Sequence, residues 1–397
     1  MFEEKIELYK GEEINNLTPK YLGELLFDDI PWLPLAKKEH QAFANEFIQA
    51  GVKVVYLVDL VVQALDTSEK VKEEFIDEFI KETNIQSETL TKILKKYLLE
   101  IKDTKELVVK TQSGIKVSEL PNYKLRTLTD FVKEGKFIAN PMPNLYFTRD
   151  PFVVLNDGII LNKMHSITRS RETIYAKYIF KYHPIYHNTN LFYDRTNSFN
   201  IEGGDILILN KKALIIGVSE RTSPEAIELL AKNLFFKSNT EYENIIVLTI
   251  PHLRTFMHLD TVLTQLDVDK FAVHKECYDQ FKIYNVVIDT TRKDKLKVLP
   301  LKDKLDVVLS RLLRKDITII PCGGLDPVSA DREQWSDASN FICISPGEVI
   351  AYERNEITNE LLRSYGIKVH TIPSSELSRG RGGPRCMCIP LEREDIK

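Results

Sequence analysis

The stretch DILILNKKALIIGVSERTSPEAIELLAKN at residues 205–233, with the run NIIVLTI at 244–250, decides the expected fold. Two apolar runs joined by a short polar turn predict a hairpin. Ser223 and Pro224 then have the residue types of a helix N-cap and a first helical position. The apolar run at 244–250 predicts a further strand, so the whole stretch indicates a ββαβ unit.

The same pattern recurs twice along the chain. FVVLNDGIILN at 152–162 predicts a strand, a turn and a strand, followed by a helix that opens near Arg169. The stretch at 340–372 repeats the unit once more. Units of this kind bury their apolar faces against a neighbour or an outer helix. We therefore expect an α/β fold in which ββαβ units form a pseudo-symmetric propeller.

The N-terminal part of the chain has an alternating α/β texture. A proline after Thr18 suggests that this threonine is a helix N-cap. We expect strands at 5–9 and 52–57 and helices at 19–27 and 36–49.

From about residue 65 the texture changes to Lys- and Glu-rich stretches with apolar residues at helical spacing. Their charge runs are interpreted as a solvated face. The sequence thus predicts an α/β propeller catalytic domain formed by residues 1–64 and 137–397, with a helical subdomain inserted at 65–136.

The composition allows a sizeable core. Of the 397 residues, 43% are hydrophobic and 28% are charged, so one large domain or two ordinary ones can form. The formal net charge is −4 and the sequence pI is about 6.1. Because general nucleic-acid binders usually carry a basic surface, we expect no nucleic-acid partner.

The cysteine content and the N-terminus indicate a cellular compartment. The cysteines are odd in number and form no CxxC pair, which suits a reducing compartment and argues against disulfides or structural zinc. The N-terminus is acidic where a signal peptide is basic, and no apolar run approaches membrane-spanning length. We expect a cytoplasmic protein without a membrane partner. The cysteines are Cys277, Cys322, Cys343, Cys386 and Cys388.

The loop SRGRGGPRCMC at 378–388 holds the first candidate nucleophile, Cys386. Three arginines crowd this cysteine, and nearby positive charge favours the thiolate, which is the form that attacks electrophiles. Three other interpretations stay open. They are an inert buried cysteine, an Arg-Gly site for phosphate or single-stranded nucleic acid, and a metal site shared with Cys388.

Further polar stretches lie at the edges of the predicted units and would converge at a pseudo-symmetry axis. They supply acids and a histidine, which with the thiol suit attack on an amidine-type carbon. Several carboxylates would bind a planar cation through bidentate hydrogen bonds, and a guanidinium fits best. Each stretch also has a structural interpretation, as a turn, a bulge cap or a hydrogen-bonded pair. The stretches are 144–150, 201–205, 219–223 and 257–261.

Six short motifs occur in order along the chain: NLYFTRDPF, MHSITRSRET, IEGGD, SERTS, MHLDT and SRGRGGPRCMCIPL. With LLFDDIPW near the N-terminus and WSDASN before the last repeat, they resemble the signature segments of arginine deiminases, members of the guanidino-modifying superfamily. The resemblance covers nearly the whole chain. It implies a propeller of five α/β modules, and the inserted helices favour arginine deiminases over the smaller dimethylarginine hydrolases.

The resemblance also implies a reaction and a set of roles. L-Arginine and water would give L-citrulline and ammonia through an S-alkylthiouronium on Cys386, without a metal or organic cofactor. His258 would protonate the departing ammonia and then activate water. Asp150 and Asp260 would hold the guanidinium, and Glu202 would support the histidine. Asp205 would be structural or would support the site from behind. The carboxylate side of the substrate would contact Asn144, Arg169 and Arg221, and Arg381, on the loop beside Cys386, would also contact the substrate.

Three rival functions stay open. A related amidino enzyme, such as an amidinotransferase or an agmatine deiminase, would differ in its demand for the α-carboxylate of arginine. An arginine sensor would bind arginine and release no ammonia. A metal-dependent hydrolase would use Cys386, Cys388 and His258.

Cys388 stands where family members often have a small polar residue, and the family's opening strand and turn are shortened here. Association into a homo-oligomer is also left open.

Overall fold

The computed structural model describes residues 5–7, 11–120, 123, 128, 136–156, 158–251, 253 and 255–394, which form a mixed α/β fold. Four three-stranded units share one topology: an antiparallel pair of strands, then a third strand parallel to the second. These units are β5 (Phe152–Leu155), β6 (Gly158–Leu161) and β7 (Asn190–Tyr193); β8 (Ile206–Asn210), β9 (Ala213–Val218) and β10 (Asn244–Thr249); β11 (Leu263–Gln265), β12 (Lys270–Val273) and β15 (Thr318–Pro321); and β16 (Ile342–Ser345), β17 (Glu348–Tyr352) and β18 (Lys368–Ile372).

Helices connect the second strand of each unit to the third, and the three repeats expected from the sequence are confirmed. In the best-marked repeat, Ser223 Oγ accepts a hydrogen bond from the Ala226 N–H, and Pro224 is the first helical residue. This helix buries Ile227 and Leu230 in the core of its sheet. The connecting helices are α8 (Ile167–Ser170) and α9 (Thr173–Tyr182), α10 (Pro224–Phe236), α11 (Lys275–Gln280) and α12 (Leu305–Leu313), and α14 (Glu356–Ser364), while α13 (Pro327–Trp335) links β15 to β16.

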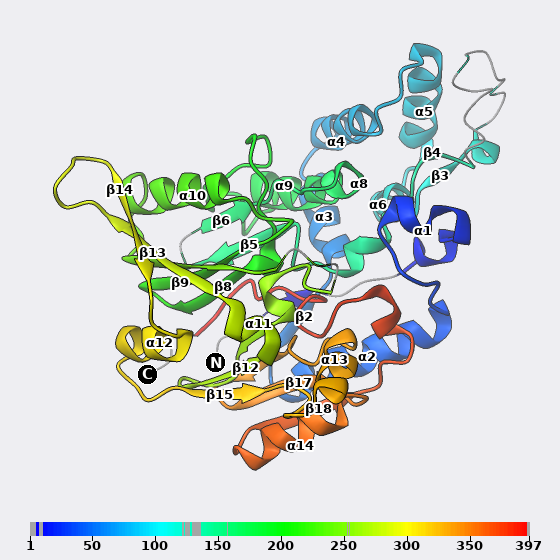
Figure 1. Cartoon of the computed structure of the whole chain (residues 1–397). Coiled ribbons are helices and arrows are strands. Elements are labelled where there is room, and N and C mark those ends of the chain that lie inside the picture. Colours follow the sequence, from blue (N-terminus) through cyan, green and yellow to red (C-terminus); the bar gives the residue numbers. More distant parts are fainter. Residues whose placement is uncertain are drawn as a thin grey trace.

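The third unit contains a hairpin that the sequence analysis missed. Strands β13 (Lys282–Ile288) and β14 (Leu296–Leu301) lie between α11 and α12. β13 pairs antiparallel with β10 of the preceding unit, which extends that sheet to five strands. Figure 1 shows the hairpin reaching out beyond α10. It therefore fastens the second and third units to each other.

The N-terminal elements differ in detail from the expected ones. β1 (Lys5–Glu7) pairs in parallel with β2 (Lys53–Val55), and residues 8 and 9 of the expected strand lie outside the described residues. α2 (Leu33–Gln49) begins before residue 36, because a proline is well suited to its first turn. Thr18 occupies the N-cap position before Pro19, as expected, but its side chain makes no capping hydrogen bond. The expected helix at 19–27 is a 3-10 turn (Pro19–Tyr21) followed by α1 (Leu22–Leu25).

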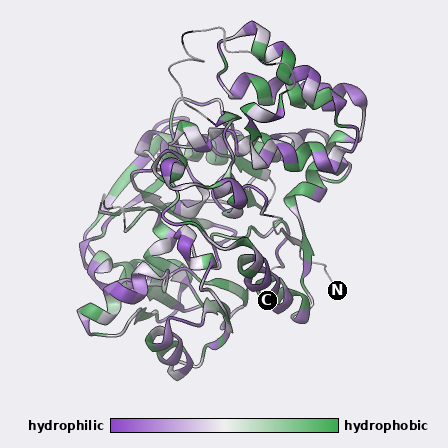
Figure 2. Cartoon of the chain, turned by 90° about the vertical axis from the view of Figure 1, so that its right-hand side faces the viewer, coloured by the Kyte–Doolittle hydropathy of each residue, from purple (hydrophilic) through white to green (hydrophobic). Residues whose placement is uncertain are grey.

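Further helices stand at one end of the molecule, above the sheets (Figure 1). Phe75 of this group packs edge-on against Tyr178 of α9, with ring centroids 5.2 Å apart, so its core is continuous with that of the first full unit. Figure 2 shows both hydrophobic and hydrophilic residues along these helices, as amphipathic segments require. The helices are α3 (Leu57–Leu65), α4 (Glu69–Glu82), α5 (Glu88–Glu100) and α6 (Thr104–Ser113), and the short strands β3 (Ile115–Lys116) and β4 (Phe137–Ala139) follow them.

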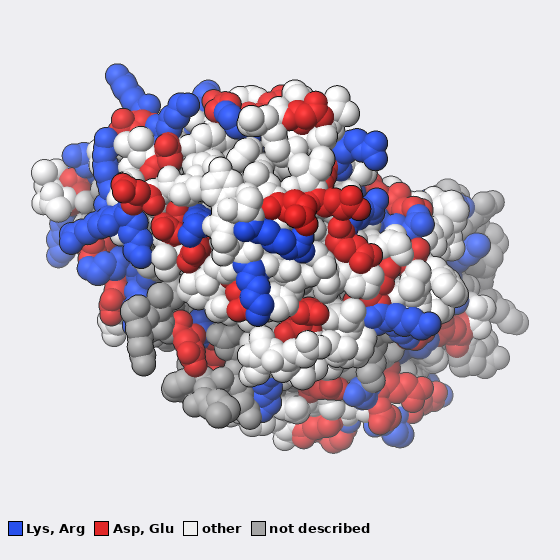
Figure 3. All heavy atoms as spheres, turned by 90° about the horizontal axis from the view of Figure 1, so that it is seen from below, with Lys and Arg blue, Asp and Glu red and all other residues white. Residues whose placement is uncertain are grey.

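Acidic and basic side chains are interspersed over the face seen in Figure 3, in keeping with the small net charge of the whole chain. Among the described residues, the helices are all too short or too polar to cross a lipid bilayer.

Candidate active site

The candidate site is built from residues that occupy the same place in different units, just before the first strand. Asp150 precedes β5, Glu202 precedes β8, His258 and Asp260 precede β11, and Asn340 precedes β16. All five side chains are buried. The repeated topology thus brings together residues that lie far apart in the sequence.

His258 lies between two carboxylates. Its Nε2 is 2.9 Å from Glu202 Oε2, and its Nδ1 is 3.7 Å from Asp150 Oδ1. The other oxygen of Glu202 accepts a hydrogen bond of 2.9 Å from the backbone N–H of His165. Glu202 is therefore fixed at both oxygens, and it fixes the orientation of the imidazole ring in turn.

Cys386 lies on the loop after the 3-10 turn Leu377–Gly380, and it contacts three other units. Its N–H donates to Asn340 Oδ1 at 3.1 Å, its carbonyl accepts from the Arg149 N–H at 3.1 Å, and its Sγ is 3.8 Å from Asp260 Oδ2. The side chain of Asn340 also donates to the carbonyl of Asp260. Asn340 was not predicted from the sequence as a site residue; its position before a predicted strand was the available signal.

In Asp150 and in Asp260, one carboxylate oxygen accepts a hydrogen bond from an arginine and the other accepts none from the described residues. Arg169 Nη1 donates to Asp150 Oδ2 at 2.7 Å, and Arg385 Nη1 donates to Asp260 Oδ2 at 2.5 Å. Both Oδ1 atoms are buried and accept no hydrogen bond from the described residues. Leaving a buried carboxylate oxygen without a donor costs free energy. The two oxygens can therefore accept N–H groups from a bound molecule.

Arg169 and Asn144 are bound to each other and to neighbouring groups. The guanidinium of Arg169 donates to Glu172 through Nε and Nη2, at 3.0 and 2.9 Å, as well as to Asp150. Its Nη2 also lies 3.3 Å from the carbonyl of Asn144, whose side chain donates to the carbonyl of Leu25. Arg169 is therefore an internal partner of Asp150 in this structure.

Arg221 and Arg381 approach the same region from other elements. Arg221 Nη1 lies 3.9 Å from Glu202 Oε2, and the buried Nε of Arg221 has no hydrogen-bond partner within the described part of the chain. The guanidinium carbon of Arg381 lies 3.5 Å from the centroid of the Trp335 ring, a cation–π arrangement. Arg381 also has a φ of +60°, a strained backbone conformation for a residue with a Cβ.

Asp205 is fully engaged by protein groups. Its Oδ2 accepts from Ser219 Oγ at 2.7 Å, and its Oδ1 accepts from the backbone N–H of Leu259 at 2.9 Å. These bonds tie β8 to the segment that carries His258. The contacts suit the structural role expected for Asp205.

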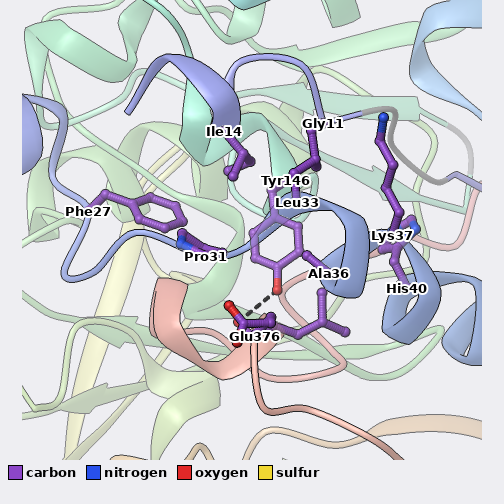
Figure 4. A pocket seen from close by; sticks show the side chains of 11 residues that line it. Gly11, Ile14, Phe27, Pro31, Leu33, Ala36, Lys37, His40, Tyr146 and Glu376 are labelled. Atoms are coloured by element: carbon purple, nitrogen blue, oxygen red, sulfur yellow. Dashed lines mark hydrogen bonds between the residues drawn. The ribbon is translucent and has the colours of Figure 1, made fainter. Parts of the chain in front are cut away.

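An apolar pocket of about 30 Å³ lies beside the cysteine loop (Figure 4). Phe27 and Tyr146 line it, and Tyr146 donates a hydrogen bond of 2.7 Å to the carbonyl of Leu377. A Cβ at Gly380 would lie 2.8 Å from the ring of Phe27. The loop that carries Cys386 thus packs closely against aromatic side chains.

The arginines of this loop do not produce a thiolate in this structure. Arg379 pairs with Asp29, and Arg385 pairs with Asp260. Burial, followed by the negative charges of Asp260 and two further carboxylates, raises the pKa of the Cys386 thiol well above its ordinary value. The charge of Arg385 offsets only part of this effect. The charge of Arg385 thus favours the thiolate as expected, but burial and the carboxylates outweigh it in the protein without substrate.

His258 is a cation in the same site. Burial lowers its pKa, but the charges of Asp150 and Glu202 and the hydrogen bond to Glu202 outweigh burial and raise the pKa to about 9. Burial likewise opposes ionisation of Glu202, but the hydrogen bond and charge of His258, with help from Arg169, lower its pKa to about 2. His258 and Glu202 therefore form a buried imidazolium–carboxylate pair at neutral pH.

A family model described as arginine deiminase matches residues 23–393. The chain belongs to the arginine deiminase family. The arginine deiminase of Clostridium perfringens is 47% identical over 389 residues, covering 97% of this chain and 94% of that protein. The arginine deiminase of Treponema denticola is 47% identical over 397 residues, covering 99% and 97%. The resemblance inferred from the six motifs is thereby confirmed.

A solved structure supports the fold beyond this family. It is a dimethylarginine dimethylaminohydrolase with a histidine-to-glycine change, carrying an S-methyl-L-thiocitrulline adduct. It aligns with a TM-score of 0.53 at 14% identity and covers 98% of this chain and 100% of that chain. This arginine deiminase family member therefore shares its mixed α/β fold with a guanidino-modifying enzyme.

The site of this arginine deiminase family member also contains a group that could hold a metal ion. Ligand atoms of Asp150, Glu202 and His258 all lie within 4.8 Å of one another. Neither this group nor a second one, found elsewhere among the described residues, includes Cys386 or Cys388. A metal at the first group would have to replace the hydrogen bond between His258 and Glu202.

We expect iodoacetamide to alkylate Cys386 slowly near neutral pH, because the raised pKa keeps its thiol protonated. The rate should rise about tenfold per pH unit until the thiol titrates. Mass spectrometry of peptides after timed alkylation measures it. Cys343 is the control, since burial raises its pKa to about 12. Fast alkylation of Cys386 that is independent of pH would show a thiolate and contradict this prediction.

We expect Gly204→Ala to reduce kcat by about a hundredfold, as misplacement of a catalytic group by about 1 Å can do. A Cβ at residue 204 would lie 2.6 Å from Cγ and Nδ1 of His258, so the ring must move. Steady-state kinetics measure the effect. Gly23→Ala is the matched control, because a Cβ there meets none of the described atoms within 4 Å. Equal kcat values for the two variants would contradict the prediction.

Proposed function

We propose that the protein hydrolyses L-arginine to L-citrulline and ammonia through a covalent intermediate on Cys386. The observation that carries the proposal is the pair of buried oxygens, Asp150 Oδ1 and Asp260 Oδ1, without donors among the described residues. A guanidinium offers planar N–H donors and a positive charge, so it can satisfy both. Membership of the arginine deiminase family supports the same substrate.

In the first half-reaction, a carbon–sulfur bond forms. The guanidinium cation offsets the carboxylate charges that raise the pKa of Cys386, so the bound substrate promotes loss of the thiol proton to solvent. The thiolate attacks the guanidinium carbon. The bond from this carbon to a terminal nitrogen then breaks, and the nitrogen leaves as ammonia after receiving a proton from His258. An S-alkylthiouronium remains on the enzyme.

In the second half-reaction, water replaces the sulfur. Neutral His258 takes a proton from water as its oxygen attacks the same carbon, and the carbon–sulfur bond breaks. Cys386 leaves as a thiolate that takes up the second proton of the attacking water, and the oxygen from water becomes the ureido oxygen of citrulline. Glu202, 2.9 Å from His258 Nε2, stabilises the imidazolium whenever it forms.

The carboxylate end of arginine is assigned to Asn144, Arg169, Arg221 and Arg381. A desolvated carboxylate needs such donors, because burying it unpaired is costly. Arg169 has Asp150 and Glu172 as partners in this structure. We propose that the substrate guanidinium replaces Arg169 at Asp150, which releases Arg169 Nη1 for the substrate carboxylate while Glu172 holds the rest of its guanidinium.

The test is citrulline formation from L-arginine by the purified protein in the presence of a chelator, with agmatine assayed in parallel. We expect turnover of arginine and a kcat/KM for agmatine at least about a hundredfold lower, because agmatine forfeits charge-assisted hydrogen bonds. Arginine binding without ammonia would support a sensor. Loss of turnover on chelation would support a metal at Asp150, Glu202 and His258. Ornithine in place of citrulline, formed when an amine such as glycine is added to accept the amidino group, would indicate an amidinotransferase. Preferred turnover of agmatine would indicate an agmatine deiminase. Each of these four results overturns the proposal.

We further propose that the four ββαβ units and the β1–β2 pair are five modules of one closed propeller, formed by residues 1–64 and 137–397. The equivalent placement of site residues before the first strands supports this symmetry. Residues 65–136 are proposed as the inserted helical subdomain. An experimental structure with an open ring would contradict the proposal.

Association into a homo-oligomer and location in the cytoplasm stay predictions, to be measured by light scattering and cell fractionation.

A further inference from the structure

A cavity of about 270 Å³ lies between strands of different units, and the thiol of Cys386 is not part of its lining. Residues of β8, β11 and β16 form its walls. The buried arginines Arg149 and Arg385 lie in this lining, together with the exposed Arg393. Two buried arginines and one exposed arginine therefore line the same cavity.

The positive charges of the two buried arginines, Arg149 and Arg385, are only partly balanced by negative charges of the protein. Arg149 is 3% exposed and Arg385 is 8% exposed. Asp260 binds Arg385, whereas no ion pair found in the described part of the chain includes Arg149, whose Nε donates to the carbonyl of Arg385 at 3.1 Å. Burial, followed by the charge of Arg385, lowers the pKa of Arg149 to about 9. Two buried cations thus share one carboxylate, an arrangement that a further anion would stabilise.

Two acidic residues also line the cavity, but neither balances the charge of the buried arginines. Asp267 accepts a hydrogen bond of 2.9 Å from Lys270 Nζ, so its charge is already paired. Glu394 is exposed and therefore solvated. The part of the lining that contains Arg149 and Arg385 therefore stays cationic.

We propose that this cavity binds a small oxyanion with two or more negative charges, either inorganic phosphate or the phosphoryl group of a small metabolite. The guanidinium groups of Arg149, Arg385 and Arg393 supply charge-assisted hydrogen bonds suited to such a group. Arg385 Nη1 also donates to Asp260 Oδ2, which lies 3.8 Å from Cys386 Sγ. One side chain thus connects the anion site to the nucleophile.

The test is binding of inorganic phosphate at constant ionic strength, measured by titration calorimetry on the full chain. We expect saturable binding with one site per chain. Arg149→Gln and Arg393→Gln should each weaken binding about tenfold or more, since a hydrogen bond to a charged group is removed. Arg311→Gln is the matched control, because that arginine is 64% exposed and lies outside the cavity lining. It should leave the Kd unchanged.

Arg221→Gln separates this site from the one proposed for the substrate carboxylate and should also leave phosphate binding unchanged. Unsaturable binding, loss of binding in Arg221→Gln, or an unchanged Kd in Arg393→Gln overturns the proposal. Because Arg393 is exposed, this last arm remains decisive even if the change at buried Arg149 prevents folding. Glycerol phosphate, titrated in parallel, identifies a phosphoryl group as the ligand if it binds tighter than inorganic phosphate.

Discussion

Cys386→Ser is expected to lower kcat for arginine by about 10⁴-fold or more, as loss of a nucleophile does in other covalent hydrolases. A serine hydroxyl is a far weaker nucleophile than a thiolate. The carboxylates proposed to bind the guanidinium are unchanged in this variant, so the Kd for arginine should stay within about threefold of the original value. Citrulline assays and calorimetric titration measure the two quantities.

Cys388→Ser is the matched control for this prediction. Its Sγ contacts the carbonyl of Pro384 at 3.5 Å, and Cys388 is buried two residues away on the same loop. Removing that thiol should leave turnover within about threefold of the original, because it is not a reacting group. If Cys388→Ser lost turnover while Cys386→Ser kept it, the nucleophile would be misassigned.

The repeated unit could be read from the sequence where its signals are local. Ser223 and Pro224 mark a helix start, and apolar runs on either side mark strands, so three of the four units were found. The third unit, from β11 to β15, was missed because the hairpin β13–β14 interrupts it. The strand β14 (LKVLPL) has one charged residue and a proline, shows no regular alternation, and pairs only at the edge of a sheet. Its partner is fixed by tertiary contact, which no local pattern records.

The site residues were predicted through motifs, but their internal partners were not. Glu172 follows Arg169 by one helical turn, and this spacing in the sequence could have indicated the pair. Arg385 and Asp260 are 125 residues apart, so their ion pair follows only from the fold. Arg385 pairs with Asp260 and not with Cys386. The closeness of the two residues in the sequence therefore did not predict the protonation state of the thiol.

Asp260→Asn is expected to have the second largest effect, on stability and on activity together. Asp260 is fully buried, and its Oδ2 binds Arg385. Breaking a buried ion pair at one partner typically costs about 3–5 kcal/mol, because the other charge stays buried. Loss of one oxygen proposed to bind the guanidinium should also lower kcat/KM by about a thousandfold, as removal of a preorganised electrostatic contact does elsewhere. Denaturant unfolding and steady-state kinetics measure these effects.

The double variant Asp260→Asn/Arg385→Gln separates the two roles. Removing both charges should recover much of the lost stability, because no buried charge is left unpaired, whereas activity should stay low since the substrate contact is still missing. Asp303→Asn is the control, because its partner Arg311 is exposed and such surface pairs contribute about 1 kcal/mol or less. If the double variant regained activity together with stability, Asp260 would act only by holding Arg385. If it regained neither, the ion pair would not be the source of the lost stability.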